Sequence, residues 1–404
     1  MKIVIFIENN RAGGLDTFCV NLIQSWPNKT DEFLLLCNHS HPGLKYIEKL
    51  EFNSLKIITH SIPLAWDINL INSIKNNNIK KIIRNIFRLL IMPYQYIRVK
   101  SLLKNINSKY LISLNGAYPG GNTTRMANIA WKKLKKGRSI HAVHGHADKN
   151  NSKIKMMVEK FINLKLFNST DDIVTVSNSC AESLRDIPGY SNFIKTNVIY
   201  NGIDCMASKN IAAIKLKDYV KLPENSPILL MLGTYSSNKG HSFLFKVMLE
   251  VIKEYPECHL VICGDGIESE KTIVKKLLAG MTSINKNIHL LDFIQGASAF
   301  MPQTDIVLIG SQENESFGLT AIEAMNNMVP VISTDVGGLK EVIEDSEVGY
   351  CCNKDNPKLF AEKIVYLLKN PKIRKKMGIK GQERVKNYFD SKKMSMEYYS
   401  LLIK

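Results

Sequence analysis

Short apolar runs alternate with stretches of helical period along the first half of the chain. The apolar runs predict strands at residues 2–7, 33–37, 56–59, 110–114, 139–143, 173–176 and 197–200. A helical period at residues 17–26 follows the pair Gly13-Gly14. Because strands separated by helices at this spacing form parallel sheets with crossover helices, we expect an α/β domain here.

The same alternation begins again in the second half of the chain. Residues 204–227 have no strong period and are expected to form a connector. The strands that follow are predicted at residues 228–233, 259–264, 288–291, 306–309 and 329–333. Two successive βαβ units of this length predict two doubly wound domains.

The predicted domains are residues 1–203 and 228–388, on either side of the connector. Residues 389–404 are expected to form a last, amphipathic helix that returns to the N-terminal domain. The large side chains on one side of this helix are Met394, Tyr398, Leu401 and Leu402.

The net charge of the chain is unevenly distributed. There are 54 Lys and Arg against 37 Asp and Glu, which gives a formal charge of +17. Residues 68–147 contain no Asp or Glu, so nearly all of the excess lies there. Such asymmetry indicates an anionic partner: a phospholipid surface, a phosphorylated acceptor or nucleic acid. The alternative is a solvated basic face without a specific partner.

A basic amphipathic segment at residues 79–97 lies within this region. Its apolar positions recur with helical spacing and are 79, 82, 83, 86, 87, 90 and 91. Its cations lie elsewhere on the helix and are Lys80, Lys81, Arg84 and Arg88. Periodicity allows two interpretations: a helix on an anionic lipid interface, or a core-facing helix with a hydrated basic face.

The cysteines and the hydropathy bear on the compartment. Eight cysteines are scattered without a C-x-x-C pair, which is typical of reduced thiols in a cytosolic protein. No apolar stretch reaches the ~18 residues that span a bilayer. We therefore expect a cytoplasmic protein that is soluble or lies on the membrane surface.

Three side chains after the strand at 139–143 raise the question of a metal. Residues two apart on an extended segment point the same way, so His144, His146 and Asp148 could converge on a zinc ion. Spacing alone is weak evidence for such a site.

The segment 313–338 has the strongest chemical pattern. The strand at 306–309 leads into a loop, and Gly318 then opens a helix that runs toward Met325. A helix N-terminus presents free N–H groups and a positive dipole end to an anion. Glu315 in the loop suits sugar hydroxyls, because a carboxylate is a strong hydrogen-bond acceptor. The alternative is an acidic residue that stabilises its own helix.

This segment resembles the donor-site signature of glycosyltransferase family 4. The matching features are the Glu315-x7-Glu323 spacing, Phe317-Gly318, Pro330-Val331 and Gly337-Gly338. Further motifs of that family occur in the same order along most of the chain, at Gly13-Gly14 and at residues 139–145, 172–177, 200–204, 232–240 and 264–266. The resemblance implies the GT-B fold, in which two Rossmann-like domains face each other across a cleft.

The resemblance also implies an activity. Family members move a sugar from a nucleotide sugar to an acceptor, with retention of configuration and without a bound metal. We expect a UDP- or GDP-sugar as co-substrate, no other cofactor, and a lipid-linked saccharide of cell-surface polysaccharide synthesis as acceptor. The N-terminal domain would bind that acceptor at the cytoplasmic face of the membrane, through Lys80, Lys81, Arg84 and Arg88.

Roles carry over from the family residue by residue. The catalytic positions would be His144 and Glu315, which contact the sugar, and Lys239, which neutralises the diphosphate. Glu323 would bind the ribose. The other implied donor contacts are Gly14, Thr234, Gly264, Phe293, Phe317, Gly318, Leu319 and Thr320.

Three positions depart from the family pattern. Thr234 stands where the family usually has Arg, which removes half of the usual diphosphate clamp. Ser316 and Met328 each stand where Gly is common.

The sequence leaves other functions open. They are a phosphorylase or nucleotide-sugar epimerase of the same fold, a catalytically silent scaffold, and a basic membrane- or nucleic-acid-binding protein. The basic segment has no helix-turn-helix, zinc-finger or RNA-binding signature, so we expect no nucleic-acid partner.

Overall fold

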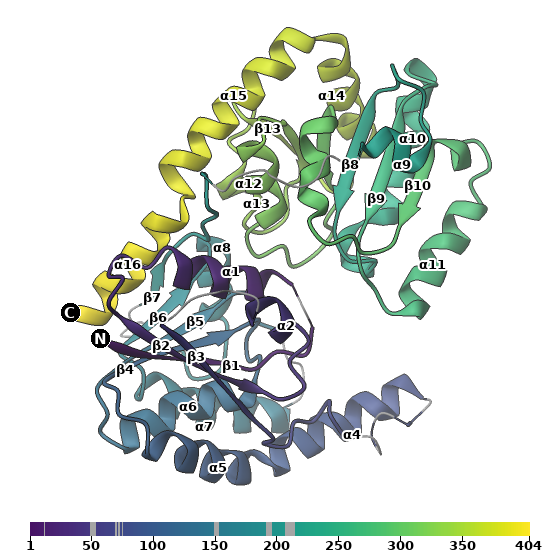
Figure 1. The fold of residues 1–404 in the computed structure, drawn as a ribbon. Helices are drawn as coiled ribbons and strands as arrows, with labels where there is room; N and C mark the ends of the chain where they lie inside the picture. Colours follow the sequence, from purple (N-terminus) through teal and green to yellow (C-terminus); the bar gives the residue numbers. More distant parts are fainter. Residues whose placement is uncertain are drawn as a thin grey trace. The chain divides into compact units, whose positions relative to one another are not determined.

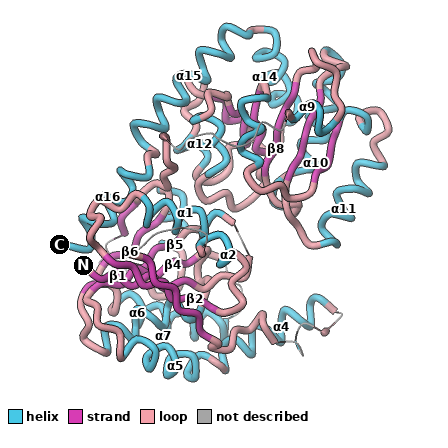
Figure 2. Tube along the Cα trace, viewed as in Figure 1, coloured by secondary structure: helices cyan, strands magenta, loops and turns pink. Residues whose placement is uncertain are grey.

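The chain divides into two compact units. The computed structural model describes residues 1–11, 13–48, 54–68, 71, 73–74, 76–148, 153–190, 196–206 and 215–404. The N-terminal unit comprises residues 1–202 together with 391–404, and the C-terminal unit comprises 203–390. In each unit the strands form a central sheet and helices cover it (Figure 2). Residues 207–214 of the predicted connector lie outside the described part.

The N-terminal unit is built on a parallel sheet of seven described strands (Figure 1). They are β1 (Lys2–Ile7), β2 (Glu32–Asn38), β3 (Leu55–His60), β4 (Tyr110–Asn115), β5 (Arg138–Val143), β6 (Asp172–Thr175) and β7 (Thr196–Val198). Their order is β3-β2-β1-β4-β5-β6-β7. Each strand lies within two residues of the segment expected from the sequence, which confirms a Rossmann-like domain.

The helices of the N-terminal unit connect these strands, except for α16, which comes from the end of the chain. They are α1 (Gly14–Gln24), α2 (Leu44–Ile47), α4 (Asn77–Leu90), α5 (Met92–Lys104), α6 (Asn122–Lys133), α7 (Lys153–Phe167), α8 (Asn178–Arg185) and α16 (Ser391–Ile403). Figure 1 shows α5, α6 and α7 on one side of the sheet and α1 on the other.

Side chains of β1 fill two layers of the core. Ile3, Ile5 and Ile7 pack with α1 and α16. Val4 and Phe6 pack on the opposite face, with α5 and α6. Successive side chains of a strand point to opposite faces, so a sheet covered on both sides needs a continuous apolar run. The apolar segment at 2–7 meets this requirement.

The last helix, α16, belongs to the N-terminal unit. The amphipathic helix expected from the sequence forms, and its buried large side chains are Met394, Tyr398, Leu401 and Leu402. Two hydroxyl contacts tie it to α1: Ser391 Oγ lies 2.7 Å from Ser25 Oγ, and Ser395 Oγ donates to the Leu22 carbonyl at 3.1 Å. The N-terminal core is therefore completed by residues from the far end of the sequence.

The C-terminal unit has a second parallel sheet, of six strands. They are β8 (Ile228–Leu232), β9 (His259–Cys263), β10 (Ile288–Leu291), β11 (Ile306–Ile309), β12 (Val331–Thr334) and β13 (Gly349–Cys352). The order among the described residues is β10-β9-β8-β11-β12-β13. The sequence patterns predicted five of these strands and missed β13.

Helices surround this second sheet as well. They are α9 (Leu216–Val220), α10 (His241–Glu254), α11 (Glu268–Ala279), α12 (Leu319–Asn326), α13 (Leu339–Val342), α14 (Pro357–Lys369) and α15 (Pro371–Tyr388). Short 3-10 turns are η1 (Ser237–Lys239), η2 (Asn285–Asn287) and η3 (Ala297–Gln303). Part of the predicted connector is helical, because α9 lies within it.

No described helix combines the length and the apolar character that crossing a bilayer requires.

Candidate functional site

Two loops at the carboxyl edge of the C-terminal sheet carry a close ion pair. Lys239 ends η1, which follows β8, and Glu315 lies in the loop after β11. Lys239 Nζ donates a hydrogen bond to Glu315 Oε2 at 2.8 Å, and Ser311 Oγ donates to the same oxygen at 2.8 Å. Because β8 and β11 are neighbours in a parallel sheet, their carboxyl ends bring these two candidate residues together.

Helix α12 begins at the end of the loop that carries Glu315. Gly318 precedes it with φ 103°, a left-handed conformation that favours glycine. A Cβ atom at this position would lie 2.7 Å from Leu339 Cδ2, so a larger residue would also displace that side chain. No side chain caps the helix, and the amides of Leu319 and Thr320 make no hydrogen bond within the described residues. This end of α12 can therefore take an anion.

Glu323 lies on α12, four residues after Leu319. Its side chain is half-buried and makes no hydrogen bond or ion pair within the described part of the chain. Burial raises the pKa of its carboxyl group from 4.5 to about 7. The group is thus an acceptor without a partner, on the helix whose N-terminus suits an anion.

The turns after β8 and β9 pack closely against each other. A Cβ atom on Gly264 would lie 1.7 Å from the carbonyl oxygen of Gly233, so only glycine fits there. The hydroxyl of Thr234 lies 2.8 Å from Ser236 Oγ. Phe293, in the loop after β10, is 54% exposed. These candidates therefore border the same edge of the sheet as Lys239.

The ring of Phe317 has a structural role. It is 2% exposed and packs edge-to-face on Phe389, with 5.5 Å between the ring centroids. The family resemblance implies that Phe317 contacts the donor, but its ring lies in the core. Only its main chain is available to a ligand.

In the N-terminal unit, His144 follows β5 and lies against α1. Its amide donates to the Asn115 carbonyl at 2.8 Å, and its ring centroid lies 4.1 Å from that of Phe18. Phe18 is on α1, the helix that begins at Gly14. Burial lowers the pKa of His144 to about 3, so the ring is neutral at physiological pH. The structure thus places His144 in contact with the helix that Gly14 begins.

The three residues considered as zinc ligands do not converge. His146 Nε2 lies 2.9 Å from Ser179 Oγ, whereas the ring of His144 faces Phe18. Across the described ranges, no three or more His, Cys, Asp or Glu side chains are grouped so that they could hold a metal ion.

The apolar stripe of α4 is exposed. Ile82, Ile86 and Leu90 are 58%, 54% and 72% exposed, so the core-facing interpretation of this helix is wrong. Figure 1 shows α4 extending away from the rest of the N-terminal unit. Lys80 and Arg84 are half-buried, and the side chain of Lys81 lies outside the described residues.

Arg88 does not join the outer basic face that the sequence predicted for it. Its guanidinium group turns inward, where Nε donates to Asn122 Oδ1 at 2.9 Å and Nη2 donates to the carbonyl of Gly120. The helical period placed Arg88 beside Arg84, but its partners lie more than thirty residues further along the chain. Periodicity carries no information about such contacts.

A buried polar network near Arg88 was not predicted from the sequence. Arg125 Nη1 donates to Glu159 Oε2 at 2.5 Å, and Arg125 Nη2 donates to Asn122 Oδ1 at 2.9 Å. Glu8, at the carboxyl end of β1, accepts the amide of Thr123 at 2.6 Å. Burial raises the pKa of Glu8.

Ser311, which donates a hydrogen bond to Glu315, was also not predicted from the sequence, although its position four residues earlier in the same loop was a usable signal.

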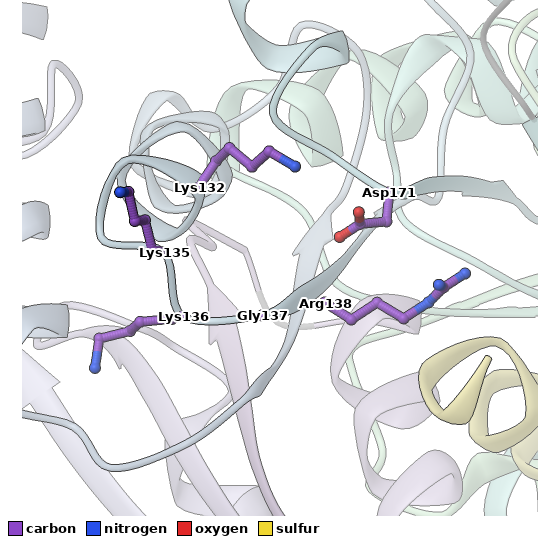
Figure 3. Close-up of a pocket in the computed structure, with 6 residues that line it drawn as sticks. All are labelled: Lys132, Lys135, Lys136, Gly137, Arg138 and Asp171. Carbon is purple, nitrogen blue, oxygen red and sulfur yellow. The ribbon is translucent and has the colours of Figure 1, made fainter.

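A shallow basic pocket lies at the amino edge of the N-terminal sheet, opposite the edge that carries His144 (Figure 3). Its volume is about 380 Å³, and its lining residues are Lys132, Lys135, Lys136, Gly137, Arg138 and Asp171. Lys136 Nζ donates to the Ile106 carbonyl, and Arg138 Nη2 donates to Asp172 at 2.6 Å. Figure 3 shows Lys136 and Arg138 pointing away from each other, so the cations do not form one anion site.

Comparison with known proteins adds to this geometry. Residues 214–384 match the family described as glycosyl transferases group 1. The chain is 26% identical over 238 residues to N-acetyl-alpha-D-glucosaminyl L-malate synthase of Bacillus anthracis, which covers 57% of this chain and 59% of that protein. It is 29% identical over 229 residues to the capsular polysaccharide biosynthesis glycosyltransferase CapM of Staphylococcus aureus, which covers 54% and 58%. The match spans less than two thirds of the length of these curated relatives.

Solved structures match over the whole chain. The structure of Anabaena HepE in complex with UDP has a TM-score of 0.76 and 16% identity, and each chain is fully covered by the other. A glycosyltransferase from Rickettsia africae has a TM-score of 0.75 and 20% identity, with 99% of this chain and 98% of that chain covered. These likenesses confirm the fold class, two Rossmann-like domains of the GT-B type.

Proposed function

We propose that the protein transfers a sugar from a nucleotide-sugar donor to an acceptor hydroxyl, on the premise that residues 214–384 match the group 1 glycosyltransferases. The observation that carries the proposal is the Lys239–Glu315 pair, whose glutamate lies in the loop that leads to the uncapped end of α12. An ammonium group and free helix amides suit a diphosphate, and a carboxylate suits sugar hydroxyls.

The proposed reaction separates the Lys239–Glu315 pair. The donor diphosphate binds the ammonium group of Lys239, and a sugar hydroxyl donates a hydrogen bond to the carboxylate of Glu315. The bond between the anomeric carbon and the phosphate oxygen breaks while the acceptor hydroxyl approaches from the same face, so configuration is retained. The leaving phosphate oxygen takes the proton of that hydroxyl. Lys239 and the amides of α12 stabilise the departing charge, the kind of contribution that is large in enzymes.

The donor is proposed to be a UDP- or GDP-sugar. Glu323 supplies the acceptor for ribose hydroxyls, because its carboxyl group has no partner among the described side chains. The positive charge of Lys239 and α12 takes the role that a divalent cation has in other transferases. UDP is the first nucleotide to test, since the Anabaena protein was solved with it. His144 is assigned to the sugar by the family resemblance.

The acceptor is proposed to be a lipid-linked saccharide at an anionic membrane surface on the cytoplasmic side. The support is the exposed apolar stripe of α4 together with the absence of Asp and Glu from residues 68–147. A helix with these properties lies in the interfacial plane of a bilayer. The relative named for capsular polysaccharide biosynthesis supports a polysaccharide product.

The proposal is tested by nucleoside diphosphate release. The purified protein is incubated with a panel of UDP- and GDP-sugars and a membrane lipid extract. We expect release from one donor, and we expect Glu315→Ala or Lys239→Ala to lower the rate by about 10²–10³. Glu313→Ala is the matched control, because Glu313 lies in the same loop with an exposed side chain. Full activity in both Glu315→Ala and Lys239→Ala would contradict the proposal.

A further inference from the structure

Arg88 joins α4 to the loop between β4 and α6. Besides the two bonds donated by its guanidinium group to Asn122 and Gly120, the Asn122 side chain donates back to the Arg88 carbonyl at 3.0 Å. The last turn of α4 and the first residue of α6 therefore hold each other by reciprocal hydrogen bonds. A planar guanidinium group can bridge two acceptors in this way, and an ammonium group cannot reproduce the fork.

This contact is built into the unit. Asn122 Oδ1 also accepts from Arg125, whose other bond goes to Glu159, and the side chains of that ion pair are 0% and 6% exposed. Burial lowers the pKa of Arg88, and the nearby Glu8 and Glu159 favour its charged form. A buried cation costs free energy unless it is hydrogen-bonded and balanced by opposite charge, and both conditions are met here.

The loop that Arg88 contacts, residues 116–121, is tied to both flanking strands. Asn115, the last residue of β4, accepts the Gly121 amide at 2.7 Å and donates to the Pro119 carbonyl at 3.1 Å. Tyr118 pairs with the loop after β5: its carbonyl accepts the Asp148 amide at 2.7 Å.

The same strand end also holds His144. The amide of His144 donates to the carbonyl of Asn115 at 2.8 Å. A continuous set of hydrogen bonds thus runs from Arg88 through loop 116–121 and Asn115 to His144. Such a contiguous network can carry a displacement from one end to the other, provided that both ends respond to it.

The outer end of this path is the exposed part of α4. Leu90, two residues after Arg88, is 72% exposed, and Ile86, two residues before it, is 54% exposed. One turn of helix therefore carries an outward apolar face and an inward arginine. The Arg88 contacts described above link this turn to Asn122 and to loop 116–121.

We propose that Arg88 is a positioning residue, which couples the docking of α4 on an anionic phospholipid surface to the arrangement of loop 116–121 and of His144. This inference rests on the membrane docking that is part of the proposed function. It adds that docking regulates sugar transfer. When α4 lies on lipid, Arg88 holds the loop in the arrangement that suits transfer. Away from lipid, the loop is less well held.

The experiment measures amide hydrogen exchange of the full chain with and without phosphatidylglycerol vesicles. In the wild type, vesicles are expected to slow exchange of residues 116–122 by about threefold or more. Arg88→Gln is expected to bind the vesicles within twofold of the wild type while losing this slowing. Arg88→Lys, which keeps the charge without the fork, is expected to recover part of it.

Controls separate the inference from the proposed function. Arg98→Gln removes an exposed arginine of α5 and is expected to keep both vesicle binding and slowing. The double variant Ile82→Glu, Ile86→Glu is expected to lose both. If vesicles still slow exchange of 116–122 in Arg88→Gln and Arg88→Lys as in the wild type, the coupling is overturned while docking stands. If the wild type binds no vesicles, the docking and the coupling both fail.

Turnover gives a second, independent readout. With the donor found by nucleotide release, Arg88→Gln is expected to lower the lipid-stimulated kcat by about tenfold and to leave the donor KM within twofold. Arg88→Lys should lie between Arg88→Gln and the wild type. A rise in donor KM at unchanged kcat would overturn the positioning role.

Discussion

Glu323 shows how one half-buried carboxyl group links pH to ligand binding. Its pKa of about 7 means that near neutral pH the group is divided between its charged and neutral forms. Ribose hydroxyls donate to the charged form, so nucleotide binding must first remove the proton wherever the group is neutral. Affinity is therefore expected to fall as the pH drops below 7.

We predict that the affinity for UDP or GDP falls by up to about tenfold per pH unit between pH 7 and pH 5.5, measured by calorimetry. The nucleotide phosphate also titrates in this range, so Glu323→Gln is measured in parallel, and the difference isolates Glu323. The variant should bind more weakly at pH 8 and show the flatter pH profile. Parallel profiles for the two proteins would refute the assignment.

The same pKa shift has a consequence for stability. Because folding raises the pKa of Glu323, the charged carboxylate destabilises the folded protein once the pH exceeds its ordinary pKa, and fully so above about 7. Without nucleotide, Glu323→Gln should thus have a higher Tm than the wild type at pH 8. At pH 4, where both side chains are neutral, the Tm values should agree.

At the scale of single elements, α4 has a row of large apolar side chains that the fold leaves exposed. Ile82 and Ile86 on the exposed stripe belong to none of the described core clusters of the N-terminal unit. We predict that Ile82→Glu with Ile86→Glu weakens binding to phosphatidylglycerol vesicles at low salt by at least about tenfold, measured by sedimentation.

The matched control for this variant is Ile273→Glu. Ile273 is 66% exposed on α11, in the other unit, so the change adds a carboxylate without touching α4. Its binding should equal that of the wild type. Raising the salt should weaken wild-type binding, because part of the attraction is electrostatic. Equal vesicle binding by the double variant and the wild type would sink the docking proposal.

Elements differ in how well the sequence predicts them. The inner strands of both sheets, such as β1 and β11, follow from continuous apolar runs, since they are buried on both faces. The strand β13 was missed because Gly349-Tyr350-Cys351-Cys352 is short and weakly apolar. The helix that follows Gly318 was expected, because a glycine after a strand and a loop is a local signal.

The candidate site was predictable only in its local parts. The Glu315-x7-Glu323 spacing lies within one loop and one helix, so the sequence shows it directly. The inward turn of Arg88 and the burial of the Phe317 ring depend on partners far along the chain. A periodic pattern records which side of a helix is apolar, but it does not record what covers that side.

At the scale of the whole molecule, the two units differ in their continuity. The C-terminal unit is one uninterrupted segment, 203–390, with its own core. The N-terminal unit needs α16 from the end of the chain, which contributes four large buried side chains. Burying each contributes roughly 1.5–3 kcal/mol, so the helix supplies ~6–12 kcal/mol. That is comparable with the whole stability of a domain, about 5–15 kcal/mol.

We predict that residues 203–390 expressed alone fold, whereas residues 1–202 alone do not. Circular dichroism and a cooperative thermal transition provide the measurement. The control joins 391–404 to residue 202 through a flexible linker and should restore a transition to the N-terminal unit. A cooperative transition of 1–202 without α16 would show that the helix is dispensable.

The chain passes from the N-terminal to the C-terminal unit after residue 202 and returns after residue 390. This path also determines how the molecule responds to mechanical force. The amide of Ile203 donates to the Phe389 carbonyl at 3.0 Å, and Ile203 forms a backbone bridge with Asp390. A pulling force applied at residues 1 and 404 is therefore carried by the backbone contacts of Ile203 with Phe389 and Asp390 for as long as these contacts remain. The inserted unit, residues 203–390, then bears little of the force. Helix α16, which is held mainly by its four large buried side chains, is the first element expected to detach.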